Sequence, residues 1–454
     1  MSTEMSRHRD RVAALASAYR SDHGPVRLAK RTSNLFRTRR PVSGPGLDVT
    51  DFDRVLHVDV AGRTADVEGM TTYEDLVDAT LRHGMMPLVV PQLRTITIGG
   101  AVTGIGIESS SFRAGLVHES VREIEVLTGN GDVVVATADN EHSDLFHGFP
   151  NSYGSLGYAL SLRIELAPVK PYVELRHLRF ADPEALFAAM GEICGAGAWF
   201  GGQVDFVDGA VFAPDDLVLT LGRFVDSAPY RSDYTGMRIY YRSLRQRTID
   251  YLGTADYLWR WDTDWFWCSK TFRVQNPWVR SLVPSGWLRS KNYWKLLAVV
   301  QRSRLDRSVD SIVGRGEREM IVQDVEVPLA RSREFLDFFH REIGILPVWM
   351  CPTSQRDPAA TWTLYSMDPE TLYVNFGFWS SRMLGPGEPR GTYNRRIEAK
   401  VAELGGRKSL YSTSYYRPDE FWRIYGGDAY HDLEKRYDGE GRLLDLYQKT
   451  VERR

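Results

Sequence analysis

The chain has 454 residues, of which 43% are hydrophobic and 26% charged, so it can fill two hydrophobic cores and is too apolar to be disordered throughout. Its formal net charge of -2 offers no excess of Lys and Arg for phosphates, which argues against a nucleic acid as partner. The three cysteines lie far apart and form no Cys/His cluster, so we expect neither disulfides nor a metal site, and a cytoplasmic location. No run of about 18 uncharged apolar residues occurs, so we expect neither a membrane-spanning helix nor a secretion signal.

Hydrophobic spacing predicts a mixed α+β first third of the chain. The expected elements are a helix over 11–19, a short strand over 25–29, strands over 55–60 and 64–69, a helix over 73–83 and a strand over 86–90. Residues 121–128 and 132–137 flank Gly-Asn-Gly-Asp, which predicts a hairpin because Gly and Asn tolerate the positive φ angles of a tight turn. A strand over 158–166 ends in Ala-Pro-Val, and we place a domain boundary near residue 168.

A second α+β sheet domain is predicted after this boundary. The pattern favours strands over 172–180, 200–206 and 217–224, with a helix over 183–194.

Residues 257–307 differ from the rest in composition. They hold seven of the twelve tryptophans, and Lys and Arg dominate their second half. Such a segment could lie at a lipid headgroup boundary, where Trp anchors and basic side chains meet anionic lipids. It could equally supply core aromatics to the second domain, with its charges in solvent.

A glycine-rich segment over 95–106 carries four glycines in eight residues. Glycine lets main chain approach a ligand closely, and free N–H groups in such a turn suit a pyrophosphate or a flavin carbonyl. No GxGxxG lies between a strand and a helix here, so a Rossmann fold is disfavoured. A plain turn between strands remains the other interpretation.

Residues 97–121 (TIGGAVTGIGIESSSFRAGLVHESV), with LTGNG at 127–131 and GSLG at 154–157, resemble the FAD-binding domain of the vanillyl-alcohol oxidase family. The resemblance implies a PCMH-type FAD-binding domain of two subdomains over 1–168 and a cap or substrate domain over 169–405. It also implies a C-terminal segment, 406–454, that returns to the flavin. The cofactor-binding residues that it implies are Thr97, Gly99, Gly100, Gly104, Ser109, Ser110 and Gly157, with Arg31, Ser33 and Asn34 in a first phosphate loop. The family's Gly-Gly-His is absent from that loop, which implies FAD held noncovalently.

The stretch GIGIESSS followed by Gly115-Leu is similar to the delta-24 sterol reductases, and the similarity continues over 322–328, 346–352 and 411–431. Those enzymes use FAD, recharged by NADPH, to reduce an isolated carbon–carbon double bond in a lipid. The Arg-, Ala- and Gly-rich composition looks actinobacterial, and actinobacteria contain flavoproteins similar to this chain that reduce a 10-methylene fatty acyl chain to the 10-methyl, tuberculostearic type. We take this lipid as the main expectation and a sterol as the alternative. The methyltransferase that makes a methylene substrate would then be a partner, and the location would be cytoplasmic or at the membrane periphery.

Reduction of an unactivated alkene needs a proton donor beside the flavin, because no carbonyl polarises the double bond. The candidates from the resemblance are Tyr411, Tyr415, Tyr430, His431 and Glu108, although each alone is more readily explained as a packed structural residue. Gln323 and Asp324 could reach the flavin or simply belong to a strand. Two other functions stay open: an FAD-linked oxidase of an alcohol or hydroxy acid, and a lipid-binding protein with a vestigial flavin site.

Overall fold

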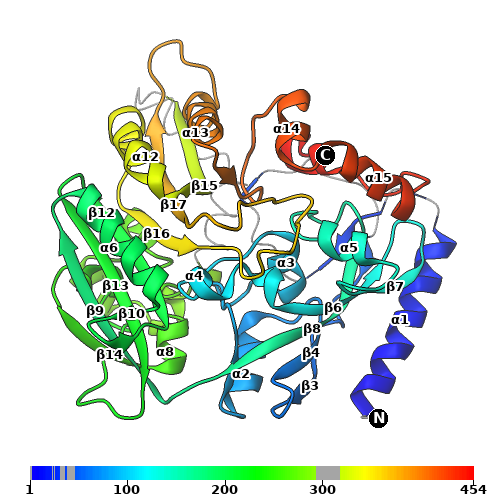
Figure 1. The fold of residues 1–454 in the computed structure, drawn as a ribbon, viewed down its shortest axis with the longest axis horizontal. Helices are drawn as coiled ribbons and strands as arrows, with labels where there is room; N and C mark the ends of the chain where they lie inside the picture. The colour runs from blue at the N-terminus through cyan, green and yellow to red at the C-terminus, as the bar shows by residue number, and fades with distance from the viewer. Residues whose placement is uncertain (1–2, 23, 25, 31–35, 38–45, 293–316) are drawn as a thin grey trace.

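The computed structural model describes residues 3–22, 24, 26–30, 36–37, 46–292 and 317–454. Within them the chain forms an N-terminal sheet of six strands and, later in the sequence, a larger sheet of eight. Figure 1 shows the N-terminal part in blue and cyan, the larger sheet in green and yellow, and the C-terminal helices in red at the upper right. The predicted α+β class is confirmed.

The N-terminal sheet is antiparallel, in the order β3-β4-β8-β6-β7, and β5 pairs with the end of β8. Its strands are β3 (Val55–Asp59), β4 (Thr64–Glu68), β5 (Met85–Pro87), β6 (Val121–Leu127), β7 (Val133–Ala136) and β8 (Tyr158–Pro168). The helices of this part are α2 (Tyr73–Leu81), α3 (Ile98–Thr103), α4 (Ser111–Ala114), η1 (Val117–Ser120) and α5 (Ser143–Gly148). The pairing of β6 with β7 confirms the predicted hairpin.

Helix α1 (Thr3–Ser21) and the parallel pair β1 (Leu28–Ala29) and β2 (Leu47–Asp48) flank this sheet. Val12, Leu15 and Tyr19 of α1 pack on Leu127 and Leu160 in a small core of their own. The helix predicted over 11–19 is therefore correct but too short.

Every strand pair of the larger sheet is antiparallel, in the order β14-β9-β13-β12-β16-β17-β15-β18. The strands are β9 (Tyr172–Phe180), β12 (Phe206–Ala213), β13 (Asp216–Val225), β14 (Ile249–Gly253), β15 (Arg318–Pro328), β16 (Val348–Thr353), β17 (Tyr373–Met383) and β18 (Arg407–Lys408). The strand predicted over 200–206 is wrong: β10 (Ala198–Trp199) and β11 (Gly202–Gln203) make a small hairpin instead, because Gly201 turns the chain at a φ of 76°.

One face of the larger sheet is covered by α6 (Pro183–Ala196), α12 (Ser332–Phe338) and α13 (Thr392–Glu403). Leu217, Leu219 and Leu221 of β13 point to these helices, whereas Val218 points to the opposite face, as alternation along a strand requires. That opposite face shares one hydrophobic core with the N-terminal sheet. The two sheets therefore enclose common interior space, and whether 1–168 and 169–405 are separate domains stays a prediction.

The remaining elements connect and cover these sheets. They are α7 (Tyr240–Ser243), α8 (Thr254–Leu258), η2 (Cys268–Phe272), α9 (Pro277–Ser281), η3 (Ser285–Leu288), η4 (Leu329–Arg331), η5 (Phe339–Ile343), α14 (Pro418–Ile424), α15 (Gly427–Tyr437) and η6 (Gln448–Glu452). The C-terminal helices lie beside α5 and the β6–β7 turn, where Asn130 Nδ2 donates to the Arg436 carbonyl at 2.8 Å. Of the helices that the structure describes, none combines the length and apolar character needed to cross a bilayer.

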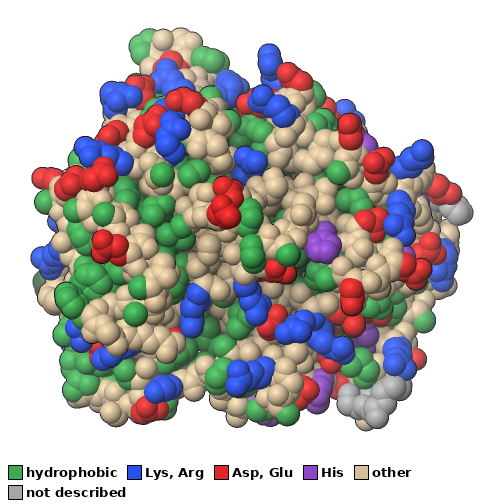
Figure 2. All heavy atoms as spheres, in the orientation of Figure 1, with side chains coloured by type: hydrophobic (Ala, Val, Ile, Leu, Met, Phe, Trp, Pro, Cys, Tyr) green, Lys and Arg blue, Asp and Glu red, His purple; other side chains and the backbone are tan. Residues whose placement is uncertain are grey.

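The tryptophan-rich segment divides into two parts. Trp259, Trp261, Trp265 and Trp267 are buried in the shared core, as the core interpretation expects. Trp278 and Trp287 are exposed, and Trp294 lies outside the described residues. Figure 2 shows Lys and Arg mixed with Asp and Glu over one face of the molecule, in keeping with the near-zero net charge.

Candidate functional site

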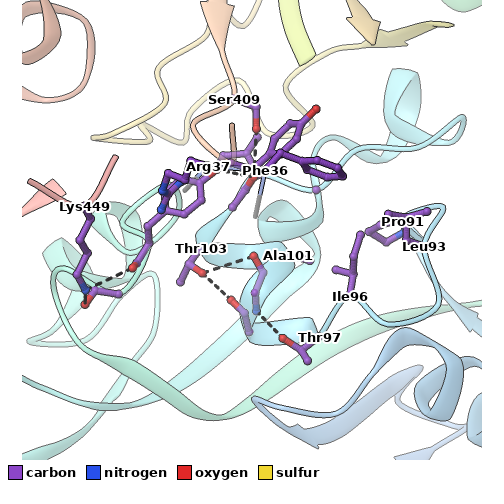
Figure 3. Close-up of a pocket in the computed structure, with 18 of the residues that line it drawn as sticks. Phe36, Arg37, Pro91, Leu93, Ile96, Thr97, Ala101, Thr103, Ser409 and Lys449 are labelled. Atoms are coloured by element: carbon purple, nitrogen blue, oxygen red, sulfur yellow. Dashed lines mark hydrogen bonds between the residues drawn. The ribbon is translucent and has the colours of Figure 1, made fainter. Parts of the chain in front are cut away.

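A cavity of about 530 Å³ lies where the glycine-rich segment, the larger sheet and the C-terminal segment meet. This volume falls in the range of small-molecule and cofactor sites. In Figure 3, α3 forms one wall, Phe36, Arg37 and Ser409 lie across from it, and Lys449 lies at one end.

The glycine-rich wall is α3, which begins after its N-cap residue Thr97. The Gly100 N–H donates to Thr97 Oγ1 at 3.2 Å, and Thr103 Oγ1 donates to the Gly99 carbonyl at 2.9 Å. A Cβ on Gly99 would lie 2.7 Å from the Gly69 carbonyl oxygen, and one on Gly104 would lie 2.8 Å from that of Gly100. Only glycine permits this packing, so bare main chain forms the wall.

Gly157 continues this wall from the N-terminal sheet. Its φ is 136°, and a Cβ there would lie 2.6 Å from the Leu127 carbonyl oxygen. The residues predicted for cofactor binding that do line the cavity are thus Thr97, Gly99, Gly100, Gly104 and Gly157.

Basic side chains from both ends of the chain line the cavity: Arg27, Lys30, Arg37, Lys449 and Arg454. Lys449 Nζ donates to the Gly154 carbonyl at 2.5 Å, and the Arg37 guanidinium lies 4.8 Å from the centre of the Tyr153 ring. Cations beside bare main chain are the donors that a diphosphate requires. The residues present therefore fit the diphosphate of FAD.

Large aromatic rings form another wall, with Trp265, Phe266, Trp349, Trp379 and Tyr411 among the lining residues. The rings of Phe266 and Trp379 stack with centres 4.2 Å apart and planes 29° apart. Such a wall excludes water and suits a flat ring system or an apolar chain.

Tyr411 and Asp324 form a half-buried hydrogen-bonded pair at this wall. Tyr411 Oη donates to Asp324 Oδ2 at 2.7 Å, and Trp379 Nε1 donates to Tyr411 Oη at 3.3 Å. Asn375 Nδ2 holds the other carboxyl oxygen of Asp324 at 2.9 Å. Burial raises the pKa of Asp324 to about 6, because the charged form loses its hydration. The pair can therefore hold and pass a proton near neutral pH.

The register between strands β15 and β17 leaves room for the Asp324 carboxyl group. Asp324 lies opposite Gly377, where a Cβ would come within 2.5 Å of Asp324 Oδ1 and 2.7 Å of Trp379 Cη2. A side chain at Gly377 would displace the carboxyl group.

Glu326 lies two residues along β15 and also lines the cavity. Tyr365 Oη donates to its Oε2, while within the described part of the chain Oε1 has no hydrogen-bond partner. Burial raises the pKa of Glu326 to about 8. Glu326 is thus protonated at neutral pH and can donate a hydrogen bond into the cavity.

Three predicted residues lie off the cavity, and two of them, Glu108 and Ser109, connect the N-terminal part to the rest of the chain. Glu108 Oε1 and Asp208 Oδ2 each accept from Arg260 Nη2 at 2.7 Å, and burial raises the pKa of Glu108. Ser109 Oγ lies 2.9 Å from Tyr257 Oη, and Ser110 Oγ donates to the Leu88 carbonyl at 2.7 Å. The residues lining the cavity do not include Glu108, Ser109 or Ser110.

The other predicted acids also lie off the cavity. Tyr430 is buried and its Oη accepts from the Leu446 N–H at 3.0 Å, while His431 is half exposed, 3.4 Å from Glu434. The Tyr415 ring packs 5.0 Å from the Arg395 guanidinium. Of the predicted acids only Tyr411 lines the cavity, and the roles of the others stay predictions. Arg31, Ser33 and Asn34 lie outside the described residues.

Sequence reasoning missed Glu326, Arg37 and Lys449, and it left Asp324 undecided beside Gln323. Strand alternation separates the last two, because Gln323 Nε2 donates to Asn394 on the helix-covered face at 2.5 Å. The alternation also places Glu326 with Asp324, a signal that could have identified it.

The comparisons with known proteins agree with this geometry. Residues 5–137 match the family described as FAD binding domain. The chain is 26% identical over 440 residues to Delta(24)-sterol reductase of Arabidopsis thaliana, a match that covers 89% of this chain and 76% of the plant protein. It is 26% identical over 409 residues to Delta(24)-sterol reductase of Homo sapiens, covering 87% of this chain and 75% of the human protein. The chain is an FAD-binding flavoprotein related to the delta(24)-sterol reductases.

A different relative matches a shorter stretch of the chain. Cytokinin dehydrogenase 2 of Oryza sativa subsp. japonica is 34% identical over 176 residues, which is 37% of this chain and 30% of the rice protein. The flavoprotein is therefore an FAD-dependent oxidoreductase, and its similarity to the sterol reductases covers much more of the chain than its similarity to the cytokinin dehydrogenase.

Proposed function

We propose that this flavoprotein reduces an isolated carbon–carbon double bond in a lipid, with NADPH as the source of reducing equivalents. The observation that carries the proposal is the half-buried Tyr411–Asp324 pair at the aromatic wall of the cavity. An alkene without a polarising group needs such a proton donor in a dry, apolar site.

The relatives favour a sterol with a side-chain alkene as the substrate, ahead of the 10-methylene acyl chain expected from composition. Both are apolar and carry one unactivated double bond, so the aromatic wall suits either. A methyltransferase partner belongs to the acyl-chain proposal alone.

FAD, when bound and reduced by NADPH, would supply the hydride. The bare main chain of α3 and the cations near Lys449 would hold its diphosphate. Trp379 fixes the Tyr411 hydroxyl through its indole N–H. When Asp324 is protonated, Tyr411 would pass its own proton to the alkene and take up the proton of Asp324 in its place, which leaves Asp324 ionised. The faces of Phe266 and Trp379 would stabilise positive charge that develops at the alkene carbon.

The test is anaerobic reduction of the purified protein by NADPH, followed by addition of either lipid, with the flavin absorbance as readout. We expect reoxidation by the lipid in the native protein. Tyr411→Phe and Asp324→Asn should keep the flavin but slow reoxidation by the lipid about 100-fold, the usual contribution of a positioned acid. Tyr415→Phe, which is off the cavity, is the matched control and should leave the rate unchanged.

Other outcomes would point elsewhere. Reoxidation of Tyr411→Phe at the native rate would remove Tyr411 as donor. Bleaching only by an alcohol, with fast reoxidation in air, would support the oxidase, and absence of flavin absorbance would support a lipid-binding protein.

A further inference from the structure

The segment that forms part of the cavity wall also carries the main exposed hydrophobic cluster of the described chain. Of the twelve large hydrophobic side chains exposed there, four lie within ten residues: Trp278, Val279, Leu282 and Trp287. Trp278 and Leu282 are both 84% exposed, and Trp287 is 69% exposed. We call residues 270–292 the tryptophan loop.

The exposed residues point the same way at the start of the loop. Trp278 is the second residue of α9 and Leu282, four residues later, is its C-cap, a spacing that puts both side chains on one side of a helical turn. Met237, which is 54% exposed, follows Gly236, whose carbonyl accepts from Arg280 Nε at 2.8 Å. The exposed apolar surface therefore extends from the tryptophan loop to the segment that contains Met237.

A buried ion pair anchors the loop. Arg280 Nη1 and Nη2 donate to Asp264 Oδ1 and Oδ2 at 2.6 and 2.7 Å, and both side chains are 1% exposed. The Asp264 N–H also donates to the Leu288 carbonyl at 2.9 Å, so both ends of the exposed stretch are fixed. The ion pair and this main-chain hydrogen bond therefore fix the main chain on which the exposed Trp278 and Trp287 lie.

The charge of this segment is of one sign. Residues 265–292 contain five Lys and Arg and no Asp or Glu. Arg280 is neutralised by Asp264, and Arg289 lies 3.5 Å from Glu74, whereas Lys270, Arg273 and Lys291 are exposed. Exposed Trp and Leu flanked by cations match a bilayer interface that carries anionic lipid.

The loop also leads directly to the cavity. Trp265 and Phe266 line the cavity and follow Asp264, the residue that anchors Arg280. Contact of the tryptophan loop with a bilayer would therefore bring the cavity wall close to membrane lipid.

We propose that the tryptophan loop docks this flavoprotein on an anionic lipid bilayer, so that a membrane lipid can reach the cavity. Trp278, Leu282 and Trp287 enter the headgroup region, and Lys270, Arg273 and Lys291 meet anionic headgroups. The delivery of a membrane lipid to the cavity rests on the proposed function, but binding of the loop to a bilayer can be measured without turnover.

The experiment is sedimentation of the flavin-containing protein with vesicles of phosphatidylcholine alone or mixed with phosphatidylglycerol. The native protein should bind the mixed vesicles and show a blue shift of Trp fluorescence. Trp278→Ser with Trp287→Ser should weaken binding at least about tenfold, and Lys270→Gln with Lys291→Gln about tenfold at low salt. Phe200→Ser is the matched control, because Phe200 is 90% exposed in the β10–β11 turn far along the sequence.

Retained flavin absorbance and unchanged circular dichroism show that each variant is folded. Equal vesicle binding by the Trp variant and the native protein would overturn the proposal, as would absence of native binding. A native dimer that becomes a monomer in the Trp variant, without vesicle binding, would assign the loop to contact between copies and also overturn it. Since no substrate is used, failure of the reductase proposal cannot produce any of these results.

Discussion

Asp324 and Glu326 leave the same face of β15, and burial raises the pKa of both carboxyl groups. The two differ in their partners. Asp324 has two hydrogen-bond donors, whereas within the described residues Glu326 has Tyr365 alone and one unpartnered oxygen. Asp324 thus titrates near the pH at which enzymes usually work, and Glu326 stays protonated there.

Glu326 should make stability depend on pH. Its pKa is raised in the folded state to about 8, so the unfolded chain loses this proton first, and stability falls as pH rises toward about 8. Glu326→Gln cannot ionise and should flatten the fall of Tm between about pH 5 and about pH 8, by up to about 1.4 kcal/mol per pH unit in the free energy of unfolding. Thermal unfolding across this range is the measurement, and Glu440→Gln, an exposed position, should keep the native slope. If Tm depended on pH in the same way for Glu326→Gln and the native protein, Glu326 would be ionised in the folded state.

At the scale of single elements, the parts of the site differ in how well the sequence predicts them. The role of α3 at a ligand site could be predicted because its glycines are visible in the sequence itself, although the main chain that a Cβ on Gly99 would meet belongs to Gly69, thirty residues earlier. For the β15 carboxyl groups, alternation predicts that Asp324 and Glu326 share a face of the strand, but it does not predict which face borders the cavity. That depends on β18 and the segment that ends in Tyr411, about 90 residues later, where the Ser409 N–H donates to the Asp324 carbonyl at 3.0 Å.

The β15–β17 pair supplies a test at this scale. Gly377→Ala would place a methyl group 2.5 Å from Asp324 Oδ1, so either the carboxyl or the Trp379 ring must move. We expect a loss of about 1–3 kcal/mol in stability, with slower reoxidation of the flavin by the lipid. Gly195→Ala in α6, where a Cβ meets open space, should be neutral or slightly stabilising. Chemical denaturation compares the two, and equal stability for both variants would show that the strand pair adapts.

At the scale of the whole molecule, the C-terminal segment contacts helix α1 and the strand-like segment that follows it, next to the cavity. The Arg442 guanidinium lies 3.9 Å from the centre of the Tyr19 ring, and its Nη2 donates to the Tyr19 carbonyl at 3.1 Å. The Val26 N–H donates to the Arg442 carbonyl at 3.1 Å, next to Arg27 on the cavity wall. The two ends of the chain are thus one structural unit.

Arg442→Ala should separate these ends. Loss of a buried cation–ring contact and a charged hydrogen bond should cost about 2–4 kcal/mol, and FAD should dissociate more readily because Lys449 and Arg454 lie on the same segment. Flavin fluorescence during heating measures release, since free flavin is brighter than bound flavin. Arg417→Ala, whose side chain is 79% exposed beside Asp419, should cost less than about 1 kcal/mol. Flavin release at the same temperature in both variants would argue against this role of Arg442.

The cavity wall draws on Arg27, Gly99, Asp324 and Lys449, positions spread from the first tenth of the chain to the last. A ribosome delivers these positions in that order, so the glycine wall emerges long before the lysine that closes it. Partly made chains therefore have most of the cradle but lack its final cations and the Tyr411 wall. We therefore expect FAD to bind stably only after the C-terminal segment has been made and has packed against the cavity.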